Sequence, residues 1–336
     1  MSTQTAQTPP AGSSQRTRSC ATALVCHRCD NSYALQEAVF ACPDCGKGLD
    51  VVYDYELAAR HFKDVPSAER PPNIWHFEEL LPILDASAQA RVGRHAGYTP
   101  LIRADRLGAE LGLSNLYLKD DSTCRPSLSY KDRVVAMSVA RLLEQGKGEI
   151  GCVSTGNVGT AVAAYAAKAG VDAYVFYPNR LEDTKARACA ALGAKVCQVE
   201  GNYDEANRRC REVAEATGMD FANITLRPFY AEGAKTAAFE IVEQLDWRAP
   251  DHIVTAAAGG TLSSRLHKGL RELTLLGLSD TEPTRIHIAQ PSGCNPIASA
   301  ILAEEAEIHP VTPETAAHSL AIGAPGDGYL VIDAVL

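Results

Sequence analysis

The sequence has few of the features that mark membrane, secreted or nucleic-acid-binding proteins. No apolar run approaches the roughly 20 residues that a membrane-spanning helix needs. The first 19 residues contain no hydrophobic segment, so we do not expect a secretory signal there. Basic residues are in the minority, with 32 Lys and Arg against 41 Asp and Glu and a formal net charge of −9. We therefore expect neither a membrane nor a nucleic acid as partner, because a general nucleic-acid binder needs a basic surface.

The sequence does contain enough apolar material for a large buried core. Hydrophobic residues make up 46% and charged residues 22% of its 336 residues. This composition excludes disorder as the main state and favours two domains. The cysteine count is 11, an odd number in a chain without a secretion signal. That count favours the reducing cytoplasm over a disulfide-stabilised fold.

From residue 98 onward, short apolar runs alternate with longer helical patterns. Strands are predicted at 116–118, 150–153, 173–177, 195–199, 252–256 and 286–289. Helices are predicted at 134–145, 158–169, 181–192, 203–217, 231–245, 262–276 and 296–305. This alternation predicts an α/β fold with parallel sheets covered by helices. In such sheets, ligands bind at the loops that follow the carboxyl ends of the strands.

Four cysteines near the start of the chain form two C-x-x-C pairs. Cys26 and Cys29 are followed, after a spacer of twelve residues, by Cys42 and Cys45. Two pairs at this separation are typical of a tetrahedral Zn²⁺ site with four thiolate ligands. The alternatives are a ribbon that has lost its metal and a redox motif, although a redox motif would open a helix in a βαβ unit. We expect structural Zn²⁺, because a ribbon this short cannot build its own core.

Three further segments contain residues that could bind a cofactor or a substrate, although no single pattern is enough to assign that function. Lys131 ends a loop rich in hydroxyl residues and precedes a helix; such a lysine can bind a carbonyl cofactor covalently, although an exposed lysine at a helix start is commoner. Residues 154–160 and 256–261 each follow a predicted strand and open a helix with small residues. Such turns bind anions through backbone N–H groups, although ordinary helix capping or close packing explains either turn alone. Together the three segments suggest a phosphorylated cofactor and an anionic substrate.

The order of these segments resembles that of the threonine synthases, which belong to the fold-type-II group of pyridoxal-phosphate enzymes. The resemblance covers nearly the whole chain after residue 20. It is carried by the zinc-ribbon-like element and by segments 97–101 (GYTPL), 118–121 (LKDD), 129–133 (SYKDR), 154–157 (STGN), 230–236 (YAEGAKT) and 319–323 (SLAIG). It implies a fold-type-II α/β architecture like that of the tryptophan synthase β subunit, with two open sheets.

The resemblance also implies a domain organisation. The polar residues 1–19 are predicted to be a disordered tail, and residues 20–54 a zinc-ribbon-like element. A large cofactor domain would comprise 55–134 and 226–336, with a small α/β domain inserted at 135–225. Members of the family continue past the point that matches Leu336, and that portion supplies a Ser or Thr to the pyridine nitrogen of the cofactor. We therefore expect the large domain to be incomplete at its C-terminal end. A homodimer is expected from the resemblance alone.

Roles for individual residues follow from the resemblance. Lys131 would bind pyridoxal 5′-phosphate covalently, and its freed amine would move protons between substrate carbons. Asn157 would hydrogen-bond the phenolic oxygen of the cofactor. The cofactor phosphate would be bound by Ala258, Gly259, Gly260, Thr261 and Leu262. The substrate would be bound by Ser129, Ser154, Thr155 and Gly156.

The implied reaction converts O-phospho-L-homoserine and water into L-threonine and phosphate. The sequence departs from the family at 125–127, where Arg-Pro-Ser replaces the usual Asn-Pro-Thr. A charge at Arg125 near the pocket would keep open a β-replacement on O-phosphoserine, as in cysteate-synthase-like relatives. A non-catalytic, truncated relative is a third hypothesis. A zinc-ribbon adaptor for nucleic acids is disfavoured by the acidic charge.

Overall fold

The computed structural model describes residues 16–37, 41–179, 183–279 and 284–335. It opens with a three-stranded antiparallel sheet in which β1 (Ala21–Cys26) lies between β2 (Ser32–Ala34) and β3 (Leu49–Tyr53). The buried side chains of β1 and β3, such as Leu24 and Val51, belong to the same hydrophobic cluster as Phe239 and Leu266 of the later helices. The ribbon therefore shares its core with the rest of the molecule, as expected of an element too small to fold alone.

Part of the predicted tail is ordered. Residues 1–15 lie outside the described chain, but the predicted tail extends to residue 19, and residues 16–19 run along 81–85. The Thr17 hydroxyl donates to the Ile83 carbonyl at 2.6 Å, and the Ser19 hydroxyl donates to the Leu81 carbonyl at 2.5 Å. The prediction of disorder is thus wrong for residues 16–19, because their polar side chains find backbone acceptors on a neighbouring segment.

A connecting region of short elements follows the ribbon. Its helices are α1 (Tyr55–Asp64), η1 (Ser67–Glu69), η2 (Ile74–Leu80), α2 (Ala86–Arg91), α3 (Asp105–Leu111) and η3 (Asp121–Thr123). Its strands β4 (Leu101–Arg103) and β5 (Tyr117–Lys119) form a separate antiparallel pair. The periodicity predicted β5 within one residue but missed β4, because a three-residue strand is too short to show alternation.

The larger of the two parallel sheets has four strands in the order β8-β7-β6-β9. These are β6 (Glu149–Val153), β7 (Asp172–Pro178), β8 (Lys195–Val199) and β9 (Asp220–Phe221), connected by α5 (Asn157–Ala169), α6 (Asp183–Ala191) and α7 (Tyr203–Thr217). Successive side chains of β6 point to opposite faces, so Cys152 packs in the cluster of α5 and α6, whereas Val153 packs in that of α7. The sheet is therefore covered on both faces, as predicted for parallel strands.

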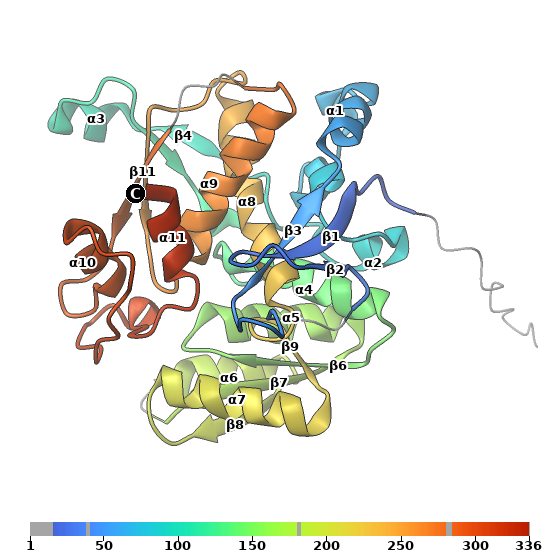
Figure 1. Cartoon of the computed structure of the whole chain (residues 1–336), viewed down its shortest axis with the longest axis vertical. Coiled ribbons are helices and arrows are strands. Elements are labelled where there is room, and N and C mark those ends of the chain that lie inside the picture. Colours follow the sequence, from blue (N-terminus) through green and yellow to red (C-terminus); the bar gives the residue numbers. More distant parts are fainter. Residues whose placement is uncertain (1–15, 38–40, 180–182, 280–283, 336) are drawn as a thin grey trace, which may run out of the picture.

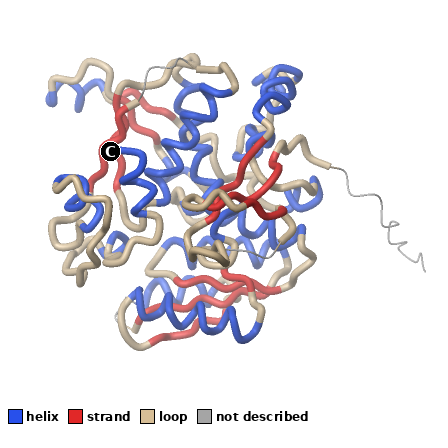
Figure 2. The backbone as a smooth tube through the Cα atoms, viewed as in Figure 1, coloured by secondary structure: helices blue, strands red, loops and turns tan. Residues whose placement is uncertain are grey.

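The second parallel sheet is the pair β10 (His252–Ala256) and β11 (Arg285–Ala289). Figure 2 shows it well separated from the four-stranded sheet. Alternate residues of both strands are exposed, and Val254 retains 75% of its accessible surface. Helices thus cover only one face of this pair in the present chain. The remaining elements are α4 (Lys131–Glu144), α8 (Arg227–Gln244), α9 (Thr261–Leu275), α10 (Pro296–Leu302), η4 (His318–Leu320) and α11 (Gly328–Val335).

Helix α8 forms the centre of the molecule, between α4 and α9 (Figure 1). It is buried continuously from Pro228 to Val242. Glycines permit the close crossings: an added Cβ at Gly233 would lie 2.4 Å from the Arg133 carbonyl oxygen, and one at Gly269 would lie 2.9 Å from that of Lys235. The predicted fold class, an α/β architecture with two parallel sheets and an N-terminal ribbon, is confirmed. The predicted domain division remains a prediction. None of the described helices is long and apolar enough to cross a membrane.

Candidate active site

A cavity of about 960 Å³ lies where α4, α5 and α9 begin. The loops after β6 and β10 open into it, as expected for the carboxyl ends of parallel strands. Its walls include every residue that the sequence predicts for cofactor or substrate: Ser129, Lys131, Ser154, Thr155, Gly156, Asn157, Ala258, Gly259, Gly260, Thr261 and Leu262. Residues that lie up to 133 positions apart in the chain therefore meet at one site, although their individual roles remain predictions.

Lys131 is the first residue of α4 and is half-buried in the cavity wall. Its Nζ donates to the Tyr130 hydroxyl and lies 4.1 Å from the centre of the Tyr130 ring. Its backbone N–H donates to the Ser129 hydroxyl at 3.2 Å. Among the described residues, Lys131 has no carboxylate partner. The amine is therefore held in the cavity without being neutralised, as a lysine that reacts with a carbonyl must be.

The buried carboxylate of Asp132 holds the loop that precedes Lys131. Asp132 accepts the backbone N–H of Ser127 at 2.9 Å, and burial raises its pKa to about 6. Arg125, in contrast, is exposed, and its side chain is not part of the cavity wall. The sequence predicted that Arg125 adds a charge near the pocket. In the structure this charge lies outside the cavity wall.

The turn at 154–157 is stabilised by hydrogen bonds between its own residues and the start of α5. The Ser154 hydroxyl accepts the N–H groups of Gly156 and Gly159, at 3.0 and 2.8 Å, and donates to the Gly156 carbonyl. The Ser154 hydroxyl and the Gly156 N–H therefore stabilise the turn and are not free donors for a substrate carboxylate. The Thr155 hydroxyl has no protein partner in the described part of the chain, and Asn157 contacts Lys185 at 3.3 Å. The Thr155 hydroxyl is thus free to meet a ligand here, whereas the Asn157 side-chain oxygen must first leave Lys185.

The turn before α9 has the geometry of an anion-binding site. Within the described residues, the backbone N–H groups of Ala258, Gly259 and Gly260 donate to no acceptor. They lie at the N-terminal end of a 15-residue helix, where the helix dipole favours negative charge. Gly260 has a φ of +92°, and an added Cβ would lie 2.8 Å from the Asp327 carbonyl oxygen. These unpaired donors and the space beside them fit the phosphate of the predicted cofactor.

An ion pair between Arg227 and Asp327 lies beside this turn and was not predicted from the sequence. The Thr261 hydroxyl donates to the Asp327 carboxylate at 2.8 Å, and Arg227 pairs with the same carboxylate at 2.5 Å. Burial alone would raise the pKa of Asp327, but the neighbouring guanidinium lowers it. Asp327 is therefore an ionised carboxylate that Arg227 neutralises beside the turn. The Gly-Asp-Gly sequence at 326–328 was the available signal, since glycines often allow a backbone to approach another segment closely.

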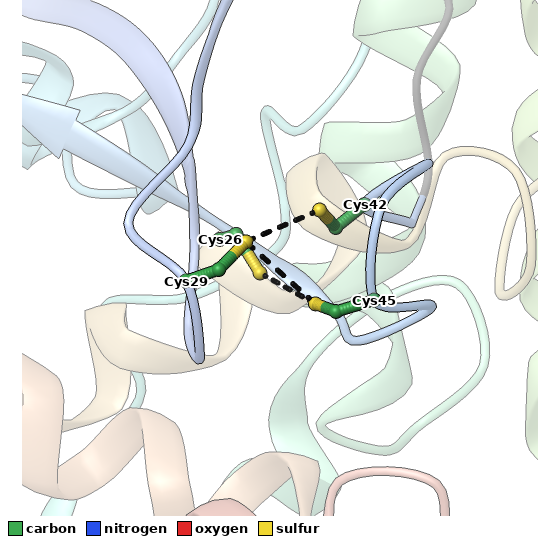
Figure 3. Close-up of side chains that lie close together, drawn as sticks. All are labelled: Cys26, Cys29, Cys42 and Cys45. Carbon is green, nitrogen blue, oxygen red and sulfur yellow. Dashed lines mark hydrogen bonds between the residues drawn. The ribbon is translucent and has the colours of Figure 1, made fainter.

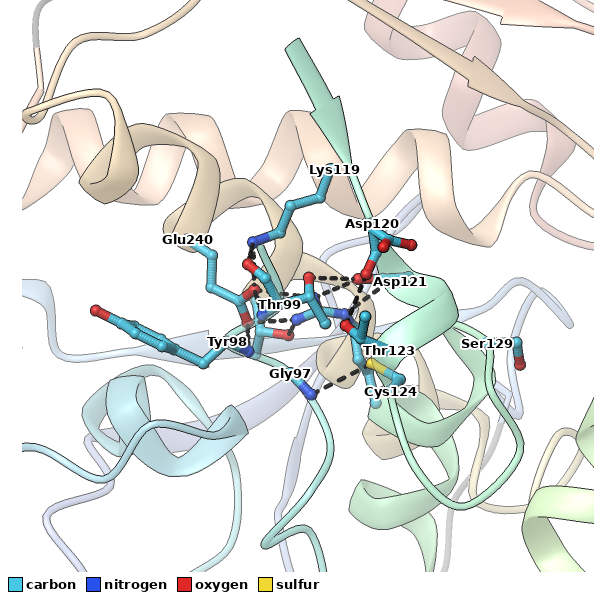
Figure 4. Close-up of polar contacts among 12 residues, drawn as sticks. Gly97, Tyr98, Thr99, Lys119, Asp120, Asp121, Thr123, Cys124, Ser129 and Glu240 are labelled. Atoms are coloured by element: carbon cyan, nitrogen blue, oxygen red, sulfur yellow. Dashed lines mark hydrogen bonds and ion pairs between the residues drawn. The ribbon is translucent and has the colours of Figure 1, made fainter. Parts of the chain in front are cut away.

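Segments 97–101, 118–121 and 129–133 contribute to a buried ion network at the start of α4 (Figure 4). Arg133 is fully buried and lies 2.7 Å from Asp121, and it also pairs with Glu240. Lys119 reaches Glu240 at 2.8 Å, and the Tyr98 N–H donates to it at 2.6 Å. Burial alone would raise the pKa of Glu240, but Arg133 and Lys119 lower it to about 2. The network anchors the first turn of α4 and thereby positions Lys131.

The four cysteines of the ribbon come together as predicted (Figure 3). Their sulfur atoms all lie within 4.8 Å of one another, and the pairs Cys26–Cys45, Cys29–Cys42 and Cys29–Cys45 are 3.4, 3.5 and 3.7 Å apart. A tetrahedral Zn²⁺ with Zn–S bonds of about 2.3 Å requires sulfur atoms about 3.8 Å apart. The Tyr33 hydroxyl lies 3.2 Å from Cys42 and lowers the pKa of that thiol to about 6. The set of donors fits a metal ion.

Comparison with known proteins places these features in a family. A model described as pyridoxal-phosphate dependent enzyme matches residues 92–335. The threonine synthase of Methanocaldococcus jannaschii is 34% identical over 312 residues, which cover 92% of this chain and 76% of that protein. The threonine synthase of Methanosarcina acetivorans is 33% identical over 314 residues, which cover 93% and 75%. That of Mycobacterium tuberculosis is 36% identical over 245 residues, which cover 71% and 63%.

Solved structures show the same fold at lower identity. Diaminopropionate ammonia lyase from Escherichia coli has a TM-score of 0.61 at 20% identity, over 84% of this chain and 69% of that one. Maize serine racemase has a TM-score of 0.60 at 23% identity, over 74% of each chain. The matches confirm the resemblance, the fold class and the expected enzyme class, a pyridoxal-phosphate-dependent lyase. The matched segment contains Lys131 and both turns that the sequence predicts to bind anions. The chain therefore belongs to the family of pyridoxal-phosphate dependent enzymes.

Proposed function

We propose that this enzyme converts O-phospho-L-homoserine and water into L-threonine and phosphate. One observation carries the proposal: a single cavity joins an unneutralised lysine to the N-terminal ends of α5 and α9. Two helix N-termini provide two places for anions, one for the phosphate of a cofactor and one for the carboxylate of an amino acid. The curated relatives named threonine synthase support the choice of substrate.

The residues of the chain would divide the work as follows. The bound cofactor supplies an electron sink for the charge that develops on the substrate carbons. Lys131 Nζ would take a proton from one substrate carbon and return it to another, as a general base and then a general acid. The Tyr130 hydroxyl already accepts a hydrogen bond from this amine and would keep it directed into the cavity. Phosphate leaves the γ carbon, and water adds at the β carbon.

The orientation of substrate and cofactor would come from backbone and hydroxyl donors. The N–H groups of Ala258, Gly259 and Gly260 would hold the cofactor phosphate. Thr155 would hold the substrate carboxylate, since Ser154 and Gly156 are paired within their own turn. Asn157 would hydrogen-bond the phenolic oxygen of the cofactor once it leaves Lys185.

The purified chain, supplemented with pyridoxal 5′-phosphate, tests this proposal in two steps. The visible absorbance band of lysine-bound cofactor should appear in the wild type and in the exposed control Lys63→Ala, and should be absent from Lys131→Ala. Threonine and phosphate should then form from O-phosphohomoserine. If phosphate is released from O-phosphoserine and not from O-phosphohomoserine, the β-replacement is favoured instead. The position of Arg125 outside the cavity removes the structural support for this alternative. The absence of the band in the wild type would favour a non-catalytic relative.

We further propose that Cys26, Cys29, Cys42 and Cys45 bind one structural Zn²⁺. The spacing of the sulfur atoms supports this assignment. A reducing cytoplasm would keep these thiols available to the metal. The proposed partners of the chain are a small phosphorylated amino acid and a second copy of the chain. Elemental analysis should find about one zinc per chain in the wild type and none in Cys42→Ser.

A further inference from the structure

The metal ribbon forms part of the wall of the active-site cavity. Ala41, Gly46, Lys47 and Gly48 line the cavity together with Lys131 and the turn before α9. All four flank the second cysteine pair, Cys42 and Cys45. The family match begins only at residue 92, so this wall comes from outside the matched segment. The ribbon therefore contributes residues to the site as well as stability.

Both cysteine pairs hold the loop that carries Lys47. The Cys42 N–H donates to the Lys47 carbonyl at 2.8 Å, and the Gly46 N–H donates to the Cys42 carbonyl at 2.8 Å. From the first pair, the N–H of His27, which follows Cys26, donates to the Gly48 carbonyl at 3.2 Å. The position of Lys47 thus depends on the geometry of the cysteine cluster.

The same loop contacts the segment that closes the phosphate-binding turn. Lys47 Nζ lies 5.2 Å from the centre of the Tyr329 ring, and an added Cβ at Gly48 would lie 2.8 Å from the Tyr329 hydroxyl. Two residues earlier, Asp327 accepts the hydroxyl of Thr261 at the start of α9. Residues 327–329 therefore lie between Lys47 and the turn that fits a phosphate.

Lys47 is a half-buried cation without a counter-charge. No carboxylate of the described residues lies within ion-pair distance of its Nζ, which lies over the Tyr329 ring. The other lining cations are Lys131, Arg208, Arg211 and Arg227. Lys131 is assigned to the cofactor, Arg227 pairs with Asp327, and the two α7 arginines are exposed. A half-buried ammonium group gains most from an anion that enters the cavity.

We propose that Lys47 binds a phosphate monoester in this cavity and that metal occupancy of the cysteine cluster holds it in place. The proposal deepens the proposed function and rests on it for the nature of the ligands. Phosphate monoesters reach the site from two sources, the cofactor and the phosphorylated substrate, and they present the same charged oxygens. The ion pair forms between Lys47 Nζ and a phosphate oxygen, with no covalent step.

Binding measurements on Lys47→Met, Lys47→Arg and the exposed control Lys63→Met test this proposal without relying on turnover. One arm titrates cofactor-free protein with pyridoxal 5′-phosphate. The other titrates cofactor-loaded protein with a phosphonate analogue of O-phosphohomoserine, whose C–P bond cannot release phosphate, and, as a phosphate-free comparison, with L-threonine. Loss of one charge-assisted hydrogen bond should raise one of the first two dissociation constants about 10- to 100-fold in Lys47→Met. The arm that changes identifies the source of the phosphate.

The controls separate a phosphate contact from a structural effect. Lys47→Arg, which keeps the charge, should bind within about threefold of the wild type, and threonine should bind all variants alike. Unchanged dissociation constants for both pyridoxal 5′-phosphate and the phosphonate in Lys47→Met would overturn the proposal. Normal phosphate binding by Lys47→Met, together with threonine formation by the wild type, would refute this inference and leave the proposed function standing. Weakened phosphate binding by Lys47→Met, with no threonine formation by the wild type, would support the inference and refute the proposed function.

Metal removal tests the second half of the proposal. A chelator that strips the cysteine cluster should weaken phosphate binding by the wild type about as much as Lys47→Met does, and should have little further effect on Lys47→Met itself. Far-ultraviolet circular dichroism checks that each stripped protein remains folded. Equal weakening of both proteins by the chelator would show that the metal acts by a route other than Lys47. If the stripped chain unfolds, the comparison of zinc-loaded variants still decides whether Lys47 binds phosphate.

Discussion

Glu240 illustrates how a single buried residue organises the site from a distance. Its carboxylate receives the Tyr98 N–H, the Lys119 ammonium and the Arg133 guanidinium, although Arg133 lies 107 positions away. It does not touch the cavity, yet it fixes the first turn of α4, where Lys131 stands. Buried charges of this kind are costly unless every one is paired. Glu240 is therefore a positioning residue for Lys131.

Replacing Glu240 by Gln should destabilise the protein by about 3–5 kcal/mol, because Arg133 would remain buried beside a neutral partner. Urea unfolding at neutral pH would measure the loss. The exposed Glu212→Gln provides the comparison, since its surface pairs with Arg208 and Arg209 should contribute less than about 1 kcal/mol. Equal effects of the two substitutions would contradict the assignment of Glu240 as the centre of the network.

The same residue predicts a pH dependence. Arg133 lowers the pKa of Glu240 from an ordinary value of 4.5 to about 2. Its stabilising contribution is therefore present above about pH 4.5 and declines as the pH falls through about 2, because the unfolded chain binds the proton first. The difference in unfolding free energy between the wild type and Glu240→Gln should narrow over this acidic range. A difference that stays constant from pH 7 to pH 3 would contradict the lowered pKa.

Among the elements, α9 links the ribbon, the cavity and the core. The turn before it carries the unpaired N–H groups of the predicted phosphate site, and Gly269 further along allows close packing on α8. Arg265 of the same helix pairs with Asp50 of the ribbon at 2.5 Å. A small displacement of this helix would thus affect three parts of the molecule together. Its N-terminal turn requires glycine because Gly260 has a φ of +92° and lies against the Asp327 carbonyl.

Gly260→Ala should weaken cofactor binding at least about tenfold, because the new Cβ would meet the Asp327 carbonyl oxygen and the backbone would remain at a φ of +92°. Gly277→Ala is the matched control: it has a φ of +67° but open space around the Cβ position. The control should cost only about 1–2 kcal/mol of stability and leave cofactor binding unchanged. Spectrophotometric titration of both variants with pyridoxal 5′-phosphate would decide; similar affinities would refute the close approach.

At the scale of the whole molecule, the ribbon and the catalytic part share one core and one ionic interface. Lys268 of α9 lies 2.6 Å from Asp50 of β3 and 2.8 Å from Glu232 of α8. The Tyr53 hydroxyl of β3 donates to Glu232 at 2.5 Å in a fully buried position. Because the ribbon docks through buried partners that cannot be left unpaired, loss of ribbon structure should be felt throughout the fold.

Metal loss should therefore lower global stability. Structural zinc contributes about 10–16 kcal/mol in isolated zinc-finger peptides, and even a fraction of this would lower the melting temperature of the present chain by roughly 5 °C. Cys42→Ser should reproduce the effect of chelation. Cys197→Ser, in β8 and outside the cluster, should not. Calorimetric scans of both variants, with and without chelator, would test this; insensitivity of the wild type to the chelator would count against a structural metal.

Local features were the parts of the fold that the sequence predicted well. The bounds of β8, α7 and β10 coincide with the predicted 195–199, 203–217 and 252–256. Their apolar periodicity and flanking turn residues are properties of neighbouring positions. The four cysteines were equally readable, because metal ligands require a fixed spacing along the chain.

The tertiary structure decided which of the predicted groups are free to act. It paired the Ser154 hydroxyl within its own turn, left Arg125 outside the cavity and brought Lys47 into it. It also joined Arg133 to Glu240 across 107 positions. These outcomes depend on how distant segments pack, and neither local propensity nor residue spacing contains that information. The sequence by itself thus determined most of the regular elements after residue 130, the cysteine cluster and the family, whereas packing determined which donors and charges face the cavity.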